Sequence, residues 1–194
     1  MTGARFISKM YFRDVWVLGP NDTGYPGGFP RGLIDSIKRN WWGSDRLWLF
    51  SGSFKDAMGT TLDIKPETGA DVRGDAGTLP FSDEIFDFVM ADPPYSSQEA
   101  RELYDLPYFN LIATLNEMAR VCKPHGHVLF LHRLYPGAHP LFSEHFSRLE
   151  LKAIVGVLTN NGLTNMRALS VFQKTMKLEA FERSQHLEMR EAVV

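Results

Sequence analysis

Short and almost continuous apolar runs recur along the chain, and most of them stop at small, acidic or proline residues. Runs of this length with such boundaries are typical of strands that are buried on both faces of a sheet. The strongest is IFDFVMA at 85–91, and the weakest is ADVRG at 70–74. The pattern therefore predicts strands at 46–50, 59–64, 70–74, 85–91 and 128–132.

Between these runs, apolar residues recur every three or four positions, which is the period of a helix that buries one face. This period is clearest from about Tyr108 to Cys122, and the segment KPHG at 123–126 ends the predicted helix. The segment LIDSIKRN at 33–40 predicts a shorter helix. We expect further helices at 141–149 and over the last twenty residues.

Two more strands are predicted near the end of the chain, at 151–158 and 166–173. They flank TNNG at 159–162, and the pair Asn161-Gly162 favours a tight hairpin turn. Strands that alternate with helices and end in an antiparallel pair indicate an α/β fold. The predicted fold is one Rossmann-like, doubly wound, mostly parallel sheet with helices on both faces and a C-terminal antiparallel hairpin. Ligands of such sheets bind beyond the carboxyl ends of the strands, so we look for chemistry there.

The chain of 194 residues, 44% of them hydrophobic, can build one buried core. We therefore expect a single domain over 1–194, with an N-terminal segment over 1–32 and a helical tail over 176–194. An ordered loop rich in Gly and Pro occupies 19–32 of that N-terminal segment. The 21 basic and 23 acidic residues give a net charge of −2, which argues against a histone-like or arm-type nucleic-acid binder and leaves open an enzyme with a local basic groove.

The single cysteine, Cys122, excludes a disulfide within the chain and any site built from several cysteines. We expect it to be a small buried hydrophobe. All 6 histidines lie at or after His125 and lack the spacing of a zinc site, so we expect no metal. No apolar run approaches the roughly 20 residues that cross a bilayer, and the N-terminus lacks an apolar signal core. We expect a cytoplasmic protein without a membrane partner.

Three of the predicted strands end in segments that could hold a ligand. After the first, Ser51-Gly52-Ser53 would let a ligand approach the backbone closely, although the same residues also make ordinary turns. The second ends at Asp63, where a carboxylate can accept both hydroxyls of a ribose or can cap a helix. After the third, the acid of Asp75-Ala76 could hold an exocyclic amine while the apolar run LPF at 79–81 packs beneath.

The most specific feature is Asp92-Pro93-Pro94-Tyr95, which follows the strongest predicted strand. Two consecutive prolines cannot continue a ladder, so they fix a rigid turn and leave their carbonyl groups free as acceptors. An acid before them and an aromatic residue after them form an acceptor pair beside a stacking platform. This arrangement suits a planar substrate that carries an NH2 group, and its alternative is a bare structural turn.

Together these segments resemble, in their order, a class I S-adenosylmethionine-dependent methyltransferase of the DPPY type, a group that methylates amino groups of nucleic-acid bases. The resemblance spans about 25–172, which is nearly the whole chain. The upstream segment YPGGFP at 25–30 resembles the motif that contacts the methionine part of the cofactor in such enzymes. The segments that carry the resemblance are LFSGS at 49–53, TLDI at 61–64, GDAGTLPFSDEIFDFV at 74–89, ADPPY at 91–95 and MARVCKPHGHVLFLH at 118–132.

The resemblance implies S-adenosylmethionine as the cofactor. It places the first loop around the methionine and ribose, Asp63 on the ribose hydroxyls, and Asp75 with Ala76 at the adenine edge. The family usually has an acid at the position of Trp48, so that acid's role passes to another group or the affinity is lower. The implied cofactor-binding residues are Pro26, Phe29, Phe50, Ser51, Gly52, Ser53, Asp63, Ile64, Asp75, Ala76 and Asp92.

The implied catalytic residues are Asp92, Pro93, Pro94 and Tyr95. An exocyclic amine is a poor nucleophile because its lone pair is delocalised into the ring. Asp92 and the carbonyl of Pro93 could each accept one amine hydrogen, which aims the lone pair at the methyl group for an in-line displacement. Tyr95 would stack on the base after the base has left its helix.

The expected function is therefore methyl transfer to DNA, first to adenine N6 and next to cytosine N4. Alternatives are an RNA enzyme that methylates adenine N6 or guanine N2, and a cofactor-binding auxiliary subunit of a methyltransferase complex. Methylation of a protein glutamine is disfavoured because the related turn begins with asparagine instead of Asp92. The chain has no room for a separate target recognition domain, since only 96–107 and the hairpin near Asn160 could serve. We expect DNA or RNA as the partner, with DNA favoured, and a homodimer or a partner subunit could supply target recognition.

Other residues leave two interpretations open. His132 ends a strand on the same rim as Asp92, and a surface or loop histidine is the simpler interpretation. Arg167 lies on the final hairpin and could contact substrate or belong to turn chemistry. The aromatic residues could line a groove or fill the core, and these are Trp41, Trp42, Tyr104 and Tyr108.

Overall fold

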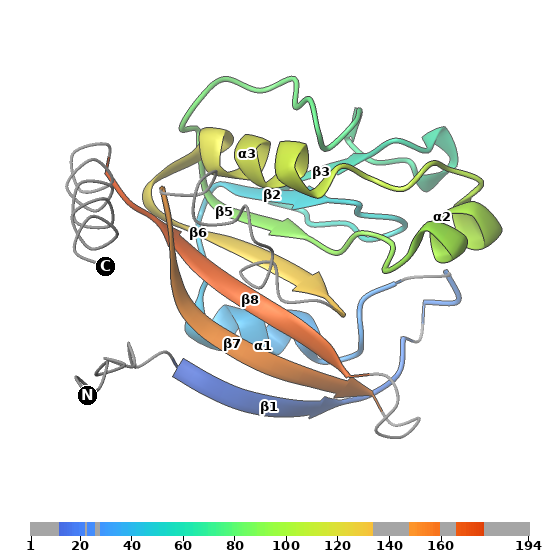
Figure 1. Ribbon diagram of the computed structural model, residues 1–194, viewed down its shortest axis with the longest axis horizontal. Coiled ribbons are helices and arrows are strands. Elements are labelled where there is room, and N and C mark those ends of the chain that lie inside the picture. Colours follow the sequence, from blue (N-terminus) through green and yellow to red (C-terminus); the bar gives the residue numbers. More distant parts are fainter. Residues whose placement is uncertain (1–11, 22, 26–27, 134–147, 160–165, 177–194) are drawn as a thin grey trace, which may run out of the picture.

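A computed structural model describes residues 12–21, 23–25, 28–133, 148–159 and 166–176. In these ranges one sheet of eight strands has the order β1-β7-β8-β6-β5-β2-β3-β4 (Figure 1). Most neighbouring strands are parallel, and β8 is antiparallel to both β6 and β7. The predicted α/β fold with a C-terminal antiparallel pair is confirmed. The strands are β1 (Phe12–Leu18), β2 (Arg46–Leu49), β3 (Thr60–Asp63), β4 (Val72–Arg73), β5 (Phe86–Ala91), β6 (Cys122–His132), β7 (Leu149–Thr159) and β8 (Arg167–Lys174).

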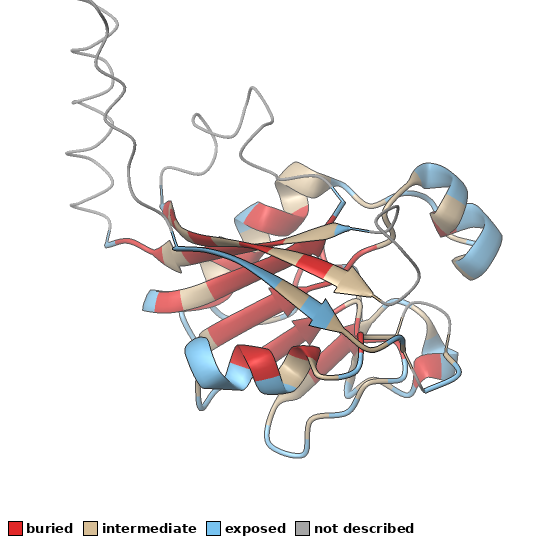
Figure 2. Cartoon of the chain, turned by 90° about the horizontal axis from the view of Figure 1, so that it is seen from below, coloured by how far each residue is buried: buried red, intermediate tan, exposed pale blue. Residues whose placement is uncertain are grey.

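Helices cover both faces of the sheet, so the described core has two halves. On one face α3 (Leu111–Val121) packs on the strands, and on the other α1 (Leu33–Asn40) does so (Figure 1). Successive side chains of a strand point to opposite faces. In β2, Leu47 and Leu49 therefore belong to the α3 side, whereas Trp48 belongs to the α1 side. Both sides of the central strands are buried (Figure 2), which explains their continuous apolar runs.

The predicted strands and the two described helices of the prediction are confirmed, with shifted ends. The ladder between β5 and β6 is irregular because Phe86 pairs with Cys122 and Phe88 with His127. Residues 123–126 therefore bulge out at the segment that we predicted to end the helix, and His125 there has a φ of 63°. The predicted turn at 160–162 and the C-terminal helix from 177 lie outside the described residues. So does the predicted helix at 141–149, except that Leu149 begins β7.

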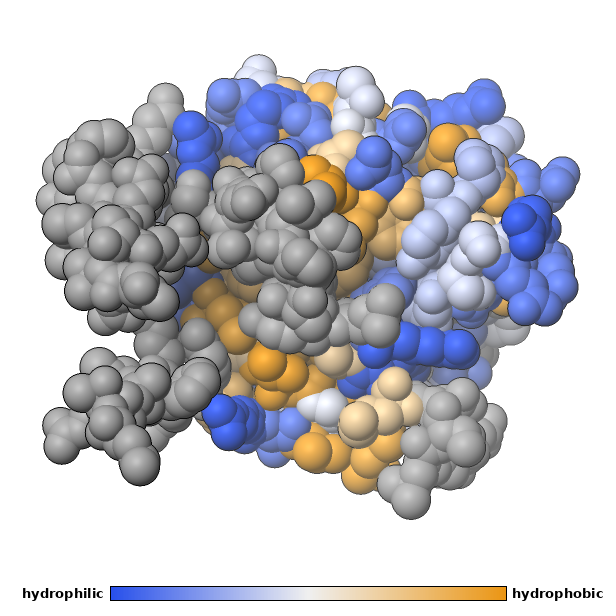
Figure 3. Space-filling view, viewed as in Figure 1, coloured by the Kyte–Doolittle hydropathy of each residue, from blue (hydrophilic) through white to orange (hydrophobic). Residues whose placement is uncertain are grey.

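Two elements were not predicted. Among the described strands, the edge strand β1 pairs only with β7, and its side chains are largely exposed, so it lacks the apolar run of a buried strand. The helix α2 (Ser97–Tyr104) buries only Ala100 and therefore has little apolar periodicity. The hydroxyl of Ser96 accepts a hydrogen bond from the amide of Glu99 and caps its first turn. Figure 3 shows the hydrophilic side chains that gather around this helix.

No helix in the described ranges is both long enough and apolar enough to span a membrane.

Candidate active site

A cavity of about 390 Å³ opens beyond the carboxyl ends of β2, β3, β4 and β5. Its wall combines the segments that follow these strands with the connection between α2 and α3. Because parallel strands end at the same edge, four segments that are separated in sequence meet there. The residues that line it are Tyr25, Phe50, Gly52, Leu62, Asp63, Ile64, Lys65, Gly74, Asp75, Ala76, Gly77, Thr78, Asp92, Pro94, Tyr104, Leu106, Pro107, Tyr108, Phe109, Asn110 and Ala113.

Most of the residues that the sequence singled out for a cofactor lie in this wall. Three others lie elsewhere: Phe29 packs on Trp48 and Phe54, Ser51 is buried, and Ser53 is exposed. Pro26 lies outside the described residues. The wall includes Phe50, Gly52, Asp63, Ile64, Asp75, Ala76 and Asp92 from the predicted set.

The loop after β2 brings its backbone close to the cavity. Phe50 and Gly52 both adopt the left-handed region, with φ of 55° and 52°. A Cβ on Gly52 would lie 2.6 Å from a ring carbon of Tyr25, so this position has no room for a side chain. The missing side chain lets the ring of Tyr25 pack against this turn, and the residues Tyr25, Phe50 and Gly52 together form one part of the cavity wall.

The carboxylate of Asp63 is held by the backbone on two sides. Its Oδ2 accepts a hydrogen bond from the amide of Gly52 at 2.8 Å, and its Oδ1 accepts one from the amide of Lys65 at 2.9 Å. Each carboxylate oxygen can accept a second bond, so both retain capacity for a hydroxyl. In the wall segment that follows β4, the Oδ1 of Asp75 accepts from the amide of Gly77 at 2.8 Å.

Trp48, at the position where the resembling family has an acid, belongs to the α1 side of the sheet. Its indole Nε1 donates to Asp56 at 2.9 Å, and Arg46 forms a two-pronged ion pair with the same carboxylate at 2.7 and 3.0 Å. The hydrogen bonds from Arg46 are the main reason why the pKa of Asp56 is lowered to about 2. Trp48 is fully buried and does not line the cavity. The position at which the resembling family has an acid is therefore occupied by a core residue in this protein.

Asp92 lies in the cavity wall with only 9% of its surface exposed. Its Oδ1 accepts a hydrogen bond from the hydroxyl of Tyr95 at 2.5 Å. Its Oδ2 is buried and has no hydrogen-bond partner within the described ranges. Burial raises the pKa of Asp92 to about 7, against the lowering effects of Arg167 and the Tyr95 hydrogen bond. Near neutral pH this carboxyl group therefore has one free acceptor oxygen and titrates.

Tyr95 is tied into the protein through its hydroxyl, its amide and its ring. The hydroxyl accepts from Arg167 Nη1 at 2.8 Å while it donates to Asp92, and the amide donates to Glu99 at 2.8 Å. The ring meets His132 edge to face, with centroids 5.4 Å apart. Tyr95 is absent from the cavity wall described above. Its stacking on a substrate base stays a prediction.

His132 is 3% exposed, so the interpretation as a surface or loop histidine is wrong. Its Nε2 lies 3.2 Å from the hydroxyl of Tyr108, and its ring hydrogen-bonds to the backbone of Pro94. Burial is the main reason why the pKa of His132 is lowered, which favours the neutral ring. Of the aromatic residues that could line a groove or fill the core, Tyr104 and Tyr108 line the cavity.

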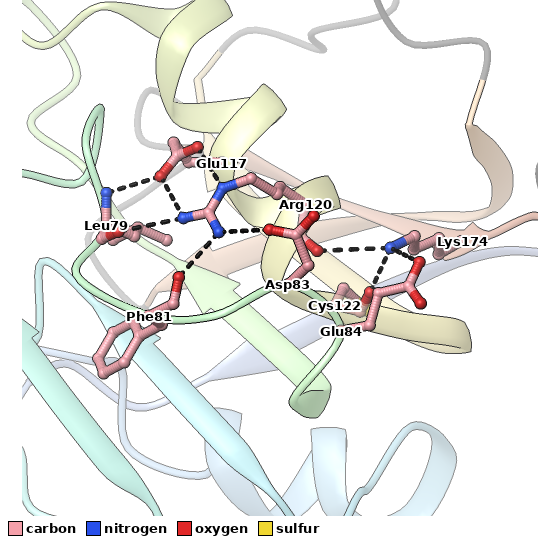
Figure 4. A network of polar contacts seen from close by, with 8 residues as sticks. All are labelled: Leu79, Phe81, Asp83, Glu84, Glu117, Arg120, Cys122 and Lys174. Carbon is pink, nitrogen blue, oxygen red and sulfur yellow. Dashed lines mark hydrogen bonds and ion pairs between the residues drawn. The ribbon is translucent and has the colours of Figure 1, made fainter.

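A polar network on α3 holds the segment that follows Asp75-Ala76 (Figure 4). Arg120 bonds both oxygens of Glu117, the carboxylate of Asp83 at 2.7 Å, and two backbone carbonyls at 3.1 and 2.8 Å. Glu117 in turn accepts from the amide of Leu79 at 2.7 Å. The carbonyls belong to Leu79 and Phe81, which are part of the run that we predicted to pack beneath the site. The sequence analysis missed this role of Arg120.

Beside this network, Lys174 is 2% exposed and donates to the carbonyl of Cys122 at 2.6 Å and to Glu84 at 3.0 Å (Figure 4). Cys122 is fully buried, as predicted, and burial raises its pKa to about 12. Within the described ranges, no group of three His, Cys, Asp or Glu side chains could hold a metal ion.

No family model matches the chain, and no curated protein matches it either. Solved structures do. One comes from a study of the conversion of a disulfide bond into a thioacetal group during echinomycin biosynthesis, with a TM-score of 0.54 and 17% identity over 88% of this chain and 92% of that one. Another is the complex between the Haloferax volcanii Trm112 methyltransferase activator and a methyltransferase, with a TM-score of 0.51 and 16% identity over 74% and 89%. The MccD protein has a TM-score of 0.51 and 12% identity over 73% and 96%. At these identities the likeness establishes the fold alone, a mixed α/β sheet that the chain shares with the methyltransferase of the Trm112 complex.

Proposed function

We propose that the protein is an S-adenosylmethionine-dependent methyltransferase that acts on the exocyclic amino group of a nucleic-acid base, with adenine N6 of DNA as the first candidate. One observation carries the proposal. The cavity wall contains most of the residues expected to hold the cofactor and also Asp92, whose buried Oδ2 has no partner in the described part of the chain. A cofactor site and an unused acceptor therefore share one cavity.

The side chains of the cavity fit the proposed cofactor. Asp63 has two oxygens with spare acceptor capacity for the ribose hydroxyls, and the turn at Gly52 brings the backbone to the cavity wall. Asp75 and Ala76 of the same wall would face the adenine edge. When bound, S-adenosylmethionine supplies an electrophilic methyl group on its sulfonium.

At the part of the site that would hold the methyl acceptor, Asp92 accepts one hydrogen of the substrate amine and the carbonyl of Pro93 accepts the other. These two bonds direct the nitrogen lone pair toward the methyl group, and the carboxylate stabilises the positive charge that develops on nitrogen. The new C–N bond would replace the bond from carbon to sulfur, with S-adenosylhomocysteine as the leaving group, and the methylated nitrogen would give its extra proton to Asp92. The group is effective when it is ionised, and a pKa of about 7 allows this at and above neutral pH. The aromatic walls formed by Tyr104 and Tyr108 suit a planar base.

RNA is the second candidate polymer, because the described residues near the site offer little surface for the specific recognition of duplex DNA. Between β5 and α3 they consist of residues 92–96, the short α2 and a connection at 105–110. Recognition of a folded RNA by shape would require less base-specific contact. A third candidate is an auxiliary subunit, or an enzyme that needs a second subunit. It is supported by the fold similarity to a methyltransferase whose structure was solved with an activator protein.

The proposal is tested by incubating the protein with S-adenosylmethionine labelled on its methyl group and with separate pools of unmethylated DNA and of RNA. Digestion to nucleosides then identifies both the polymer and the methylated atom. We expect label in N6-methyladenosine species from one pool. Cofactor binding without label in either pool would contradict the proposed activity and favour the auxiliary subunit.

A further inference from the structure

Two residues that follow β5, Asp92 and Tyr95, form a short hydrogen-bonded series with Arg167 from the distant strand β8. Arg167 from β8 donates to the hydroxyl of Tyr95 at 2.8 Å, and that hydroxyl donates to Oδ1 of Asp92 at 2.5 Å. Arg167 and Tyr95 are 72 positions apart in sequence. The series therefore depends on the antiparallel pairing of β8 with β6, which places β8 next to the strand beside β5.

The direction of this series follows from the chemistry of its members. A guanidinium can only donate hydrogen bonds, so the oxygen of Tyr95 must accept from Arg167. The single hydroxyl hydrogen of Tyr95 is then available to Asp92. Oδ1 of Asp92 is occupied by this bond, while Oδ2 is buried and without a partner in the described ranges.

We propose that Arg167 is a positioning residue for methyl transfer, which acts through the hydroxyl of Tyr95 to orient Asp92 and to keep its Oδ2 as the acceptor of the amine hydrogen. This inference rests on the proposed function for the identity of the reaction. The arrangement of the three side chains is a property of the fold and can be tested without catalysis.

One carboxylate with the same charge as Asp92 lies near it. Glu99 of α2 raises the pKa of Asp92, whereas Arg167 and the hydroxyl of Tyr95 lower it. Tyr104 also lies within electrostatic range. On the other side of Tyr95 lie the buried His132 and the guanidinium of Arg133. Without Arg167, burial and Glu99 would act on Asp92 with less opposition, and its carboxyl group would remain protonated to higher pH.

Arg133 provides a matched control for Arg167. Its guanidinium carbon lies 5.5 Å from the centre of the Tyr95 ring, and that of Arg167 lies 5.6 Å from it. Only Arg167 donates to the Tyr95 hydroxyl among the described contacts. Arg133→Met therefore removes a cation at the same distance from the ring and leaves the series of hydrogen bonds intact.

The test uses the full chain with 13C-labelled aspartate carboxyl groups, and Asp92→Asn assigns the Asp92 signal. We expect the titration midpoint of Asp92 to rise by roughly one pH unit in Arg167→Met and in Tyr95→Phe, and to stay unchanged in Arg133→Met. Arg167→Lys, which keeps the charge without the planar fork, should shift the midpoint less than Arg167→Met. If Arg167→Met does not fold, Tyr95→Phe and Arg167→Lys decide the question.

Kinetics provide the second measurement on the same variants. The midpoint of the dependence of kcat on pH should rise in Arg167→Met in parallel with the carboxyl titration, while the KM for S-adenosylmethionine stays within about twofold. An Asp92 titration in Arg167→Met that matches the unmodified protein, or an equal shift in Arg133→Met, would overturn the inference. If no polymer is methylated, the proposed function fails, and the carboxyl titration still decides whether Arg167 positions Asp92.

Discussion

At the scale of single residues, the carboxylate of Asp92 is the proposed acceptor of the amine hydrogen, and its burial lowers the free energy of unfolding when it is ionised. Its pKa is about 7 in the folded protein, mainly because of burial, whereas an aspartate in an unfolded chain has a pKa of about 3.9. Between these values the folded state binds more protons than the unfolded state. The free energy of unfolding therefore decreases as the pH rises from about 4 to about 7.

Asp92→Asn should accordingly stabilise the protein. We expect a free energy of unfolding that is higher by on the order of 2 kcal/mol at about pH 8, and a gain less than half as large at about pH 5. Urea unfolding at both pH values measures it. Asp75→Asn alters an exposed carboxylate of the same cavity and should change stability by less than about 0.5 kcal/mol. A destabilised Asp92→Asn variant at the higher pH would show that the buried charge is compensated by other contacts.

Asp63 is the residue on which cofactor affinity should depend most. Asp63→Ala removes the proposed ribose acceptor and leaves the amides of Gly52 and Lys65 without their partner. We expect the Kd for S-adenosylmethionine to rise by about 10- to 100-fold in isothermal titration calorimetry. Glu67→Ala changes a neighbouring exposed carboxylate outside the cavity wall and is the control. If Asp63→Ala bound S-adenosylmethionine as tightly as the unmodified protein does, the proposed contact between Asp63 and the ribose would be wrong.

At the scale of elements, α3 is joined to the loop that follows β4 through Arg120. This side chain ties the helix to the carbonyls of Leu79 and Phe81, just beyond the wall residues Asp75 and Ala76. The carbonyls would otherwise need other partners, because buried or half-buried backbone groups are costly when unpaired. One side chain thus fixes the loop after β4.

Arg120→Met should destabilise the protein by about 2 kcal/mol in urea unfolding, since it removes several charged hydrogen bonds from a partly exposed site. The amide of Leu79 should also exchange its hydrogen faster, because its acceptor Glu117 loses the cation that holds it. Arg101→Met removes an exposed arginine of α2 and should change neither quantity. Unchanged exchange at Leu79 in Arg120→Met would mean that packing alone fixes this loop.

Some elements could be predicted from the sequence and others could not, and the difference has a physical reason. The buried strands β2, β3 and β5 were predicted because burial on both faces demands continuous apolar runs. The exposed helix α2 and the edge strand β1 do not need continuous apolar runs, so their sequences lack the pattern from which the other elements were predicted. Local hydrogen bonds such as the Ser96 cap stabilise α2 where apolar periodicity is weak.

The same reasoning applies to the site. Its position and many of its wall residues followed from the ends of parallel strands, which must lie at one edge. Side-chain direction did not follow, so Ser51 and Phe29 were placed at a cavity that neither of them lines. The contacts of Tyr95 with Arg167 and of Arg120 with Leu79 join residues far apart in the chain, and spacing alone cannot predict them.

At the scale of the whole molecule, the eight-stranded sheet and its helices take up most of the described residues, and the net charge of the chain is −2. The protein is therefore expected to find its substrate through the shape of the cavity and through short segments around α2, with little help from long-range attraction. A homodimer or a partner subunit could add recognition surface. This proposal for the whole molecule depends on transfer to a base amine at Asp92.

The most direct test compares the unmodified protein with Asp92→Ala by mass spectrometry of nucleosides after reaction with S-adenosylmethionine and unmethylated DNA or RNA. The account predicts a methylated amino nucleoside, N6-methyladenine first, with the unmodified protein. It predicts no such product with Asp92→Ala, while the Kd of that variant for S-adenosylmethionine stays within about threefold. Full activity of Asp92→Ala, or no methylated amino group from the unmodified protein in either polymer, would contradict the account.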